Sequence, residues 1–289
     1  MELSLDRLTK HYGSKIAVDC VSATLKPGVY GLLGANGAGK TTLMRMLCAI
    51  LESTSGEVLL DGQEITSMGA DYRNVLGYLP QEFGFYPNYS AMEFLLYVAT
   101  LKGIPKGIAK KRAKELLEMV GLNHVTNKRI KTFSGGMKQR IIIAMALISD
   151  SDLILADEPT TALDMSVSNS ILDLLLNLKE KGKTIILITH DLSIVSNYCD
   201  SATIMYLGDI VEQASSKELF KNPRHPYTRA LLAALPSKRG KKLENIKGTI
   251  SPITEIIEGC KFHPRCKFAM EKCKTQKPVL FNGVSCHLH

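Results

Sequence analysis

A glycine-rich octapeptide is the strongest constraint on how this chain can fold. Residues Gly34–Thr41 read GANGAGKT and match the pattern G-x-x-x-x-G-K-[ST], whose backbone N–H groups surround phosphate oxygens. The apolar stretch 29–33 predicts a buried strand before this P-loop, and 40–51 predicts a helix after it. A helix N-terminus adds partial positive charge at the same point. The expected phosphate-binding residues are Asn36, Gly37, Gly39, Lys40, Thr41 and Thr42.

A second apolar segment ends in two acids and completes the expected chemistry. Four apolar residues, 153–156, predict a strand covered on both faces, and Asp157 and Glu158 follow them directly. We expect Lys40 to contact the β- and γ-phosphates, and the Thr41 hydroxyl and Asp157 to serve a Mg²⁺ ion. We expect Glu158 to polarise an attacking water as a general base.

Strand and helix signals alternate along most of the chain, which indicates an α/β core. Strands are predicted at 3–8, 16–25, 29–33, 57–60, 153–156 and 184–189. Helices are predicted at 40–51, 91–102, 107–120, 134–148 and 166–181. The helical stretch between about 85 and 133 interrupts the alternation as an insert. The polar, basic segment 236–250 reads as a linker.

Charge and composition narrow the classes of protein further. The chain has 289 residues, 45% of them hydrophobic, and a net charge of +8. Residues 1–220 carry 22 basic and 24 acidic side chains, whereas 221–289 carry 14 and 4. The basic excess therefore belongs to the C-terminal part and does not predict a nucleic-acid-binding fold. An acidic N-terminus and a longest apolar run of Ile141–Ile148 predict a cytoplasmic chain without a signal or membrane span.

Seven cysteines fall into two groups. Three stand alone and are expected in the core, namely Cys20, Cys48 and Cys199. The other four are Cys260, Cys266, Cys273 and Cys286. In a reducing compartment four clustered thiols favour a [4Fe–4S] cluster or a tetrahedral zinc site, with no metal as the third alternative.

The segment Ser134–Gln139, SGGMKQ, resembles the signature sequence of ATP-binding-cassette (ABC) ATPases. Neighbouring motifs agree with that family in order and spacing. Tyr12 resembles the aromatic residue that stacks on adenine, and Gln81 the glutamine of the Q-loop that touches metal and water. Ala162–Asp164 resembles the D-loop, and His190 the switch histidine that contacts the γ-phosphate. The resemblance covers residues 1 to about 220.

The resemblance implies a P-loop ATPase core with an antiparallel β subdomain and a helical insert. It implies a nucleotide-binding domain at 1–220 and a small cysteine-rich appendage within an importer-type extension at 221–289. ATP and Mg²⁺ would be sandwiched between two such subunits, identical or different. The residues that would face the partner's ATP or the dimer interface are Ser134, Gly135, Gly136 and Asp164.

The two halves of the chain resemble different subfamilies. Asn222–Leu232 and Gly259–Cys266 resemble subunits of oligopeptide, dipeptide and nickel importers, whose association with an iron–sulfur cluster favours that cofactor over zinc here. Gly34–Thr42 and Leu79–Pro87 are more similar to ATPases of multidrug or antibiotic exporters. A hybrid origin with a junction near the signature would explain this difference.

These resemblances imply an ATP-hydrolysing subunit that powers import of oligopeptides, dipeptides or nickel. Its implied partners are membrane permease subunits, at the cytoplasmic face of the membrane, and a substrate-binding protein. An exporter ATPase is the first alternative. A soluble ABC protein acting on nucleic acid or ribosomes is the second, because of the basic C-terminal part, although no nucleic acid is expected. A non-hydrolysing regulator is disfavoured by Glu158 and His190.

Overall fold

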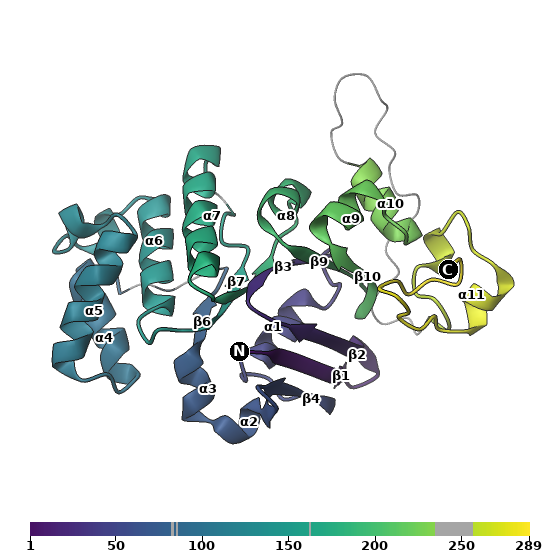
Figure 1. Cartoon of the computed structure of the whole chain (residues 1–289), viewed down its shortest axis with the longest axis horizontal. Helices are drawn as coiled ribbons and strands as arrows, with labels where there is room; N and C mark the ends of the chain where they lie inside the picture. Colours follow the sequence, from purple (N-terminus) through teal and green to yellow (C-terminus); the bar gives the residue numbers. More distant parts are fainter. Residues whose placement is uncertain (82–83, 85, 162, 235–256) are drawn as a thin grey trace. The chain divides into compact units, whose positions relative to one another are not determined.

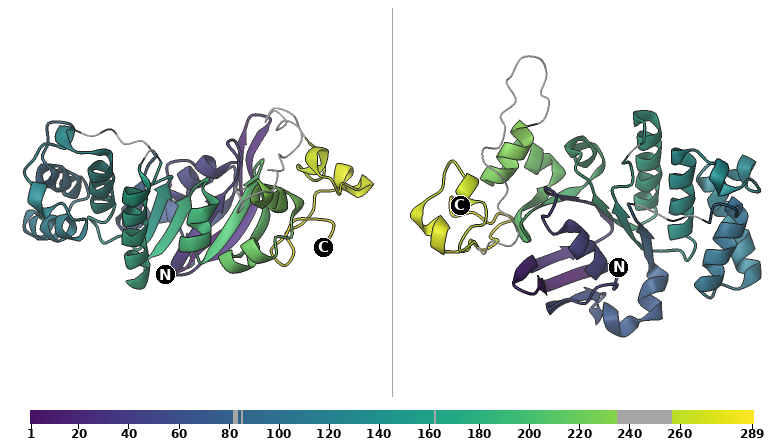
Figure 2. Two further views of the ribbon diagram at one scale, coloured as in Figure 1. Left: turned by 90° about the horizontal axis from the view of Figure 1, so that it is seen from above. Right: turned by 180° about the vertical axis from the view of Figure 1, so that it is seen from behind.

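Two units of structure make up the described part of the chain. The computed structural model describes residues 1–81, 84, 86–161, 163–234 and 257–289 (Figures 1 and 2). The predicted linker at 236–250 and Ala162 of the predicted D-loop lie outside these residues. The first unit comprises Met1–Glu2, Leu25–Val29 and Gln63–Leu187. Within the described ranges, the second comprises Leu3–Thr24, Tyr30–Gly62 and Ile188–His289.

Buried parallel strands position the acidic residues of the first unit. Strand β6 (Leu76–Leu79) pairs in parallel with β7 (Leu153–Asp157), with Leu79 opposite Ala156. Strand β7 lies between β6 and β8 (Thr184–Ile188), and every residue of β7 and β8 is buried. Continuous apolar runs are typical of strands covered on both faces. The carboxyl ends of β6 and β7 therefore meet at one edge of the sheet.

Helices form the rest of the first unit. The longer helices are α4 (Ala91–Leu101), α5 (Lys106–Met119), α6 (Gly135–Ala146) and α7 (Met165–Glu180), and they pack side by side (Figure 1). The short elements are β5 (Gln63–Glu64), α2 (Ile65–Met68), α3 (Ala70–Val75), η1 (Asn123–Val125) and η2 (Ile130–Thr132). Helix α4 starts with a reciprocal cap, since the Ser90 hydroxyl accepts the Glu93 N–H at 3.2 Å and the Glu93 carboxylate accepts the Ser90 N–H at 2.8 Å. Of these helices, α4 and α5 lie within 85–133, where the sequence predicts an insert.

An antiparallel sheet opens the second unit. Its strands β1 (Leu3–Tyr12), β2 (Lys15–Leu25) and β4 (Ser55–Leu60) lie in the order β2-β1-β4. Strand β1 pairs antiparallel with β4, with Leu3 opposite Leu60. The sequence predicted these three strands, but β1 runs on past its predicted end at residue 8 to Tyr12.

A second group of strands in this unit carries the P-loop. Strand β3 (Gly28–Leu33) pairs in parallel with β9 (Ser201–Tyr206), and β9 pairs antiparallel with β10 (Asp209–Ser215). The helices of the unit are α1 (Lys40–Leu47), α8 (Leu192–Tyr198), α9 (Ser216–Lys221), α10 (Pro226–Ala233), η3 (His263–Arg265) and α11 (Glu271–Thr275). The sequence did not predict β9 or β10.

The C-terminal segment 257–289 joins the edge of β10 (Figure 2). The Gln213 N–H donates to the Gly283 carbonyl at 2.8 Å, and the Ser285 N–H donates to the Val211 carbonyl at 2.9 Å. The segment belongs to the same unit as β10. The predicted separate cysteine-rich appendage is therefore not supported, because this segment shares backbone hydrogen bonds with a core strand.

Two helices end earlier than predicted, because residues just beyond their ends adopt positive φ angles. Helix α1 stops at Leu47 instead of 51, since Ala49 adopts φ 52°. Helix α5 stops at Met119, two residues before Gly121 at φ 71°. Among the helices that the structure describes, none has the length and apolar character needed to cross a membrane.

Candidate functional site

The P-loop leaves β3 and enters α1 through a backbone that requires glycine at two points. At Gly34, with φ 155°, an added Cβ would lie 2.5 Å from the Met205 carbonyl oxygen and 2.9 Å from the Ala38 Cβ. At Gly39, with φ 100°, it would overlap the Ala17 carbonyl oxygen. Only a residue without a side chain allows both the positive φ and this close packing.

Lys40 lies inside the loop that it terminates. Its Nζ donates to the Gly34 carbonyl at 2.7 Å and to the Ala35 carbonyl at 3.1 Å, and the side chain is 8% exposed. The loop turns around it, with the Ala38 N–H donating to the Ala35 carbonyl at 3.0 Å. The other predicted phosphate-binding residues are half-buried or exposed, namely Asn36, Gly37, Gly39, Thr41 and Thr42. An ammonium group therefore stands at the centre of a loop that remains accessible from outside.

Two further predicted residues lie in the same unit as the P-loop. The Thr189 N–H donates to the Leu32 carbonyl at 3.4 Å, which places exposed His190 beside the end of β3, where the P-loop begins. Tyr12 ends β1 and is 45% exposed, with the Lys10 Nζ at 5.6 Å from its ring centroid. The structure thus puts a ring that can stack and an imidazole in the unit that holds the phosphate loop.

The first unit gathers the predicted acids and the glutamine at one sheet edge. Buried Asp157 ends β7, and exposed Gln81 follows the end of the neighbouring strand β6. Glu158 adopts φ 48°, a left-handed conformation that is unusual without glycine. Its carboxylate accepts the Thr161 hydroxyl at 2.8 Å, and its carbonyl accepts the Thr161 N–H at 3.1 Å.

The signature and the D-loop start two helices of the first unit that touch. The Ser134 hydroxyl caps α6, and the Asp164 carboxylate caps α7 by accepting the Val167 N–H at 2.9 Å. A Cβ added to Gly136 would lie 2.5 Å from the Val167 side chain, so the glycine is needed for this contact. Gly135 precedes it in the first turn of α6. The roles of these residues stay predictions.

The four C-terminal cysteines are free thiols. The Cys260 N–H donates to the Cys273 carbonyl at 2.8 Å. Burial, added to by the neighbouring sulfurs, raises the pKa of the Cys260 thiol to about 11. Burial also raises the pKa of Cys266 and of Cys286. In the described part of the chain, no group of three or more His, Cys, Asp or Glu side chains is arranged to hold a metal ion. The predicted iron–sulfur or zinc site is therefore not supported.

Of the three solitary cysteines, two behave as predicted. Cys48 and Cys199 are buried, and burial raises the pKa of Cys199 to about 12. Cys20 is exposed, so its predicted place in the core is wrong. It lies on β2 with φ 54°, a left-handed backbone conformation that interrupts the regular alternation of the strand.

A buried acid that the sequence analysis missed anchors the end of the second unit. Glu212 on β10 is 1% exposed, and its two oxygens accept the Arg224 N–H at 2.8 Å and the His225 N–H at 2.9 Å. His225 in turn caps α10, its Nδ1 accepting the Tyr227 N–H at 3.0 Å. Burial lowers the pKa of His225 to about 4, which keeps the ring neutral. The available sequence signal was slight: Glu212 directly follows the two apolar residues Ile210 and Val211.

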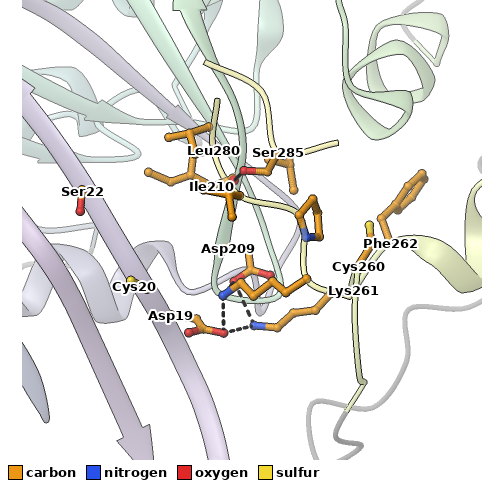
Figure 3. Close-up of a pocket in the computed structure, with 14 residues that line it drawn as sticks. Asp19, Cys20, Ser22, Asp209, Ile210, Cys260, Lys261, Phe262, Leu280 and Ser285 are labelled. Atoms are coloured by element: carbon orange, nitrogen blue, oxygen red, sulfur yellow. Dashed lines mark hydrogen bonds and ion pairs between the residues drawn. The ribbon is translucent and has the colours of Figure 1, made fainter. Parts of the chain in front are cut away.

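A cavity of about 450 Å³ is lined by residues of β2, β10 and the C-terminal segment (Figure 3). On one side, Lys261 lies 3.1 Å from Asp19 and 3.2 Å from Asp209, and Lys277 lies 2.8 and 2.9 Å from the same carboxylates. Two lysines of the basic C-terminal part are therefore neutralised by the core. Part of the charge excess therefore forms ion pairs within this unit.

Comparison with known families gives two matches on this chain. The family described as "ABC transporter" matches residues 18–161. The family described as "Oligopeptide/dipeptide transporter, C-terminal region" matches residues 211–273. The first match includes the P-loop and the acidic pair. The second includes most of β10, all of α10 and three of the four clustered cysteines.

Similar proteins extend over nearly the whole chain. A putative peptide import ATP-binding protein of Brucella ovis is 37% identical over 295 residues, covering 96% of this chain and 93% of the relative. The oligopeptide transport ATP-binding protein AppD of Bacillus subtilis is 36% identical over 292 residues, covering 93% and 88%.

Solved structures agree with this at the level of the fold. MJ1267, an ATP-binding cassette of an ABC transporter in its ADP conformation, superposes with a TM-score of 0.71 at 26% identity, covering 79% of this chain and 98% of that one. The subunit cbiO1 of Clostridium perfringens gives 0.69 at 29% identity, covering 76% and 90%. The structure has a P-loop between a strand and a helix, and an acidic strand end. Together with relatives that match nearly the whole chain, these features show that the chain belongs to the ATPase family of ABC transporters.

Proposed function

We propose that this chain is the ATP-hydrolysing subunit of a peptide importer. The observation that carries the proposal is the C-terminal region at 211–273, which matches the oligopeptide/dipeptide transporter family. Its described residues, 211–234 and 257–273, belong to the same unit as the P-loop. Relatives named for peptide import and oligopeptide transport cover more than nine tenths of the chain. The functional division is a nucleotide-binding part at 1–220 and an importer-type extension at 221–289.

Lys40 and Glu158 carry the central chemistry of the proposal. Lys40 neutralises the β- and γ-phosphates of ATP from within the P-loop, where its ammonium already lies against loop carbonyls. Glu158 polarises the attacking water from a half-buried site, with one carboxylate oxygen held by the Thr161 hydroxyl. The water oxygen bonds to the γ-phosphorus, Glu158 accepts the proton, and the bond to the β-phosphate oxygen breaks to leave ADP and phosphate.

Three oxygen donors are assigned to Mg²⁺, namely the Thr41 hydroxyl, the Gln81 amide and the Asp157 carboxylate. These donors are the hard oxygen ligands that Mg²⁺ prefers. When bound, the ion neutralises charge on the phosphates. His190 is assigned to the γ-phosphate and Tyr12 to the adenine, which its exposed ring supports.

A second ATPase subunit, identical or different, completes the site. Each chain has one P-loop and one signature, and Ser134, Gly135 and Gly136 present the N-terminus of α6, a favourable end for a phosphate. Asp164 caps α7 beside them and is assigned to the dimer interface. Closure on ATP and opening after hydrolysis would be a ligand-driven shift between two states.

The remaining partners are permease subunits in the membrane and an extracellular or periplasmic substrate-binding protein, with this chain at the cytoplasmic face. To test this, the tagged full chain is purified from detergent-solubilised membranes and the bound proteins are identified. We expect two permeases, and ATP hydrolysis that rises when peptide-loaded binding protein is added.

Two other results of this purification would contradict peptide import. A single exporter-type permease would favour the multidrug-exporter alternative, which the sequence of Gly34–Thr42 resembles. Salt-sensitive binding to RNA or DNA, with no membrane partner, would favour a soluble ABC protein.

The four cysteines carry the metal part of the proposal, a [4Fe–4S] cluster with zinc as the alternative. Backbone N–H groups already point at two of the sulfurs, from Phe268 to Cys266 and from Met270 to Cys273, each at 3.4 Å. Hydrogen bonds to sulfur are a feature of protein-bound clusters. The positions of the four side chains in the structure do not form a metal site, so binding requires the sulfurs to approach one another.

Metal analysis of the full chain tests this part separately. Anaerobic purification is expected to give a broad visible absorption and about four irons per chain, both lost on treatment with a chelator and an oxidant. A content of one zinc per chain, without iron, would contradict the cluster and support the zinc site. Absence of both metals, with all seven thiols of the unfolded chain titratable, would show that these four cysteines hold no metal.

A further inference from the structure

Two side chains from the C-terminal part are linked to the P-loop by hydrogen bonds, each involving one peptide group. The first is Tyr227, whose hydroxyl oxygen accepts the Ala35 N–H at 3.2 Å. That N–H belongs to the peptide group between Gly34 and Ala35, and the carbonyl of the same group accepts the Lys40 ammonium at 2.7 Å. Tyr227 and Lys40 therefore hold opposite ends of one peptide plane. Because the ammonium polarises the carbonyl, the N–H becomes a stronger donor to the tyrosine.

Tyr227 is held rigidly at this contact. It is 1% exposed, and its ring packs at centroid distances of 4.7 Å from Tyr206 and 5.3 Å from Phe262. Phe262 belongs to the C-terminal segment, and its ring also lies 5.8 Å from that of His225, the cap of α10. Burial raises the pKa of Tyr227, so the hydroxyl stays protonated at neutral pH.

The second side chain is Lys261. Its Nζ donates to the Leu207 carbonyl at 2.8 Å, and the N–H of the same peptide group, on Gly208, donates to the Ala38 carbonyl of the P-loop at 2.9 Å. Both residues of this turn between β9 and β10 have positive φ, 45° and 89°. The ion pairs with Asp19 and Asp209 fix the lysine at this place (Figure 3).

We propose that Tyr227 and Lys261 are positioning residues for nucleotide binding, which hold the P-loop in its phosphate-binding shape through these two peptide groups. An ordered loop binds more tightly because less conformational entropy is lost on binding. The C-terminal part of the chain would thereby set the affinity of the site for ATP. This inference rests on the proposed role of the P-loop as the phosphate site.

Nucleotide titration of matched variants of the full chain tests the inference. Tyr227→Phe removes only the hydroxyl, and Tyr206→Phe removes a hydroxyl from the same aromatic cluster as its control. Lys261→Met has Lys277→Met as its control, since Lys277 pairs with the same two aspartates. In the described ranges, only Lys261 of these two lysines bonds to the Leu207 carbonyl.

We expect Tyr227→Phe and Lys261→Met each to raise the Kd for ATP and for ADP about 3–10-fold, the value of one hydrogen bond. The controls should change the Kd less than 2-fold. In steady-state hydrolysis the KM for ATP should rise while kcat changes little, because ordering of the free loop is affected and the chemical step is not. Melting temperatures of each variant and its control should agree, since each pair loses similar packing or ion pairs.

The outcomes separate failure of this inference from failure of the proposed function. If wild-type chain binds ATP and both test variants bind as tightly as their controls, the inference is overturned and the P-loop assignment stands. If Lys40→Met binds ATP as tightly as wild type, the P-loop is not the phosphate site and both fall. Equal weakening in Lys261→Met and Lys277→Met would also overturn the role of Lys261, because the ion pairs alone would then explain it.

Discussion

Replacing Glu158 by glutamine is expected to reduce ATP hydrolysis by about 10²–10⁴-fold while leaving ATP binding intact. Glutamine keeps the size and the hydrogen bond from the Thr161 hydroxyl but cannot accept the proton of the attacking water. Like glutamate, glutamine must adopt the left-handed backbone at φ 48°, so the backbone cost is the same and the fold should not change. Phosphate release at saturating ATP measures the loss, and equilibrium titration of ATP measures retained binding.

The control for this experiment is Glu180→Gln, an exposed acid at the end of α7 in the same unit. It should hydrolyse ATP at the wild-type rate. The Glu158 variant should also accumulate as an ATP-bound dimer in size-exclusion chromatography, since closure proceeds and the reset by hydrolysis does not. Wild-type turnover by Glu158→Gln would show that another group is the base.

Replacing Lys40 by methionine is expected to weaken ATP binding about 10–100-fold, because charge-assisted hydrogen bonds contribute roughly 1.5–3 kcal/mol. Methionine retains the length of the buried stem, which is 8% exposed, and removes the ammonium. The Gly34 and Ala35 carbonyls lose a donor at the same time, so the loop itself is loosened. Titration with a fluorescent ATP analogue gives the Kd.

Lys26→Met is the control, since Lys26 is an exposed lysine whose partner Glu2 lies 3.6 Å away. Its affinity for ATP should equal that of the wild type, and both variants should melt within a few degrees of it. If Lys40→Met binds ATP with the same Kd as Lys26→Met, the assignment of the phosphate site is contradicted.

Features with a local signal could be predicted from the sequence. The two positive-φ glycines, Gly34 and Gly39, fall at fixed places in a short motif between a strand and a helix. Ser90 and Glu93 lie three residues apart and mark the start of α4 by capping each other. The run 153–156 is buried throughout, as its apolar composition predicts. In each example the determining residues are neighbours along the chain.

Features that depend on distant residues could not be predicted. Tyr227 and Ala35 are 192 positions apart, and Lys261 and Asp19 are 242 apart, so no periodicity or spacing connects them. For the same reason the basic C-terminal part read as a separate appendage, although two of its lysines pair with core aspartates. The clustering of four cysteines and the family resemblance also predicted a metal site, which the described side chains do not form.

In its proposed role as the base, Glu158 is subject to opposite demands from stability and activity. A left-handed backbone costs a residue with a side chain roughly 1–3 kcal/mol, and glycine would avoid most of that cost. A glycine has no carboxylate, however, so the replacement that best suits the backbone removes the proposed base. Efforts to make this ATPase more heat-resistant by relieving strained backbone should therefore leave position 158 unchanged, because a gain in folding free energy there is also a loss of turnover.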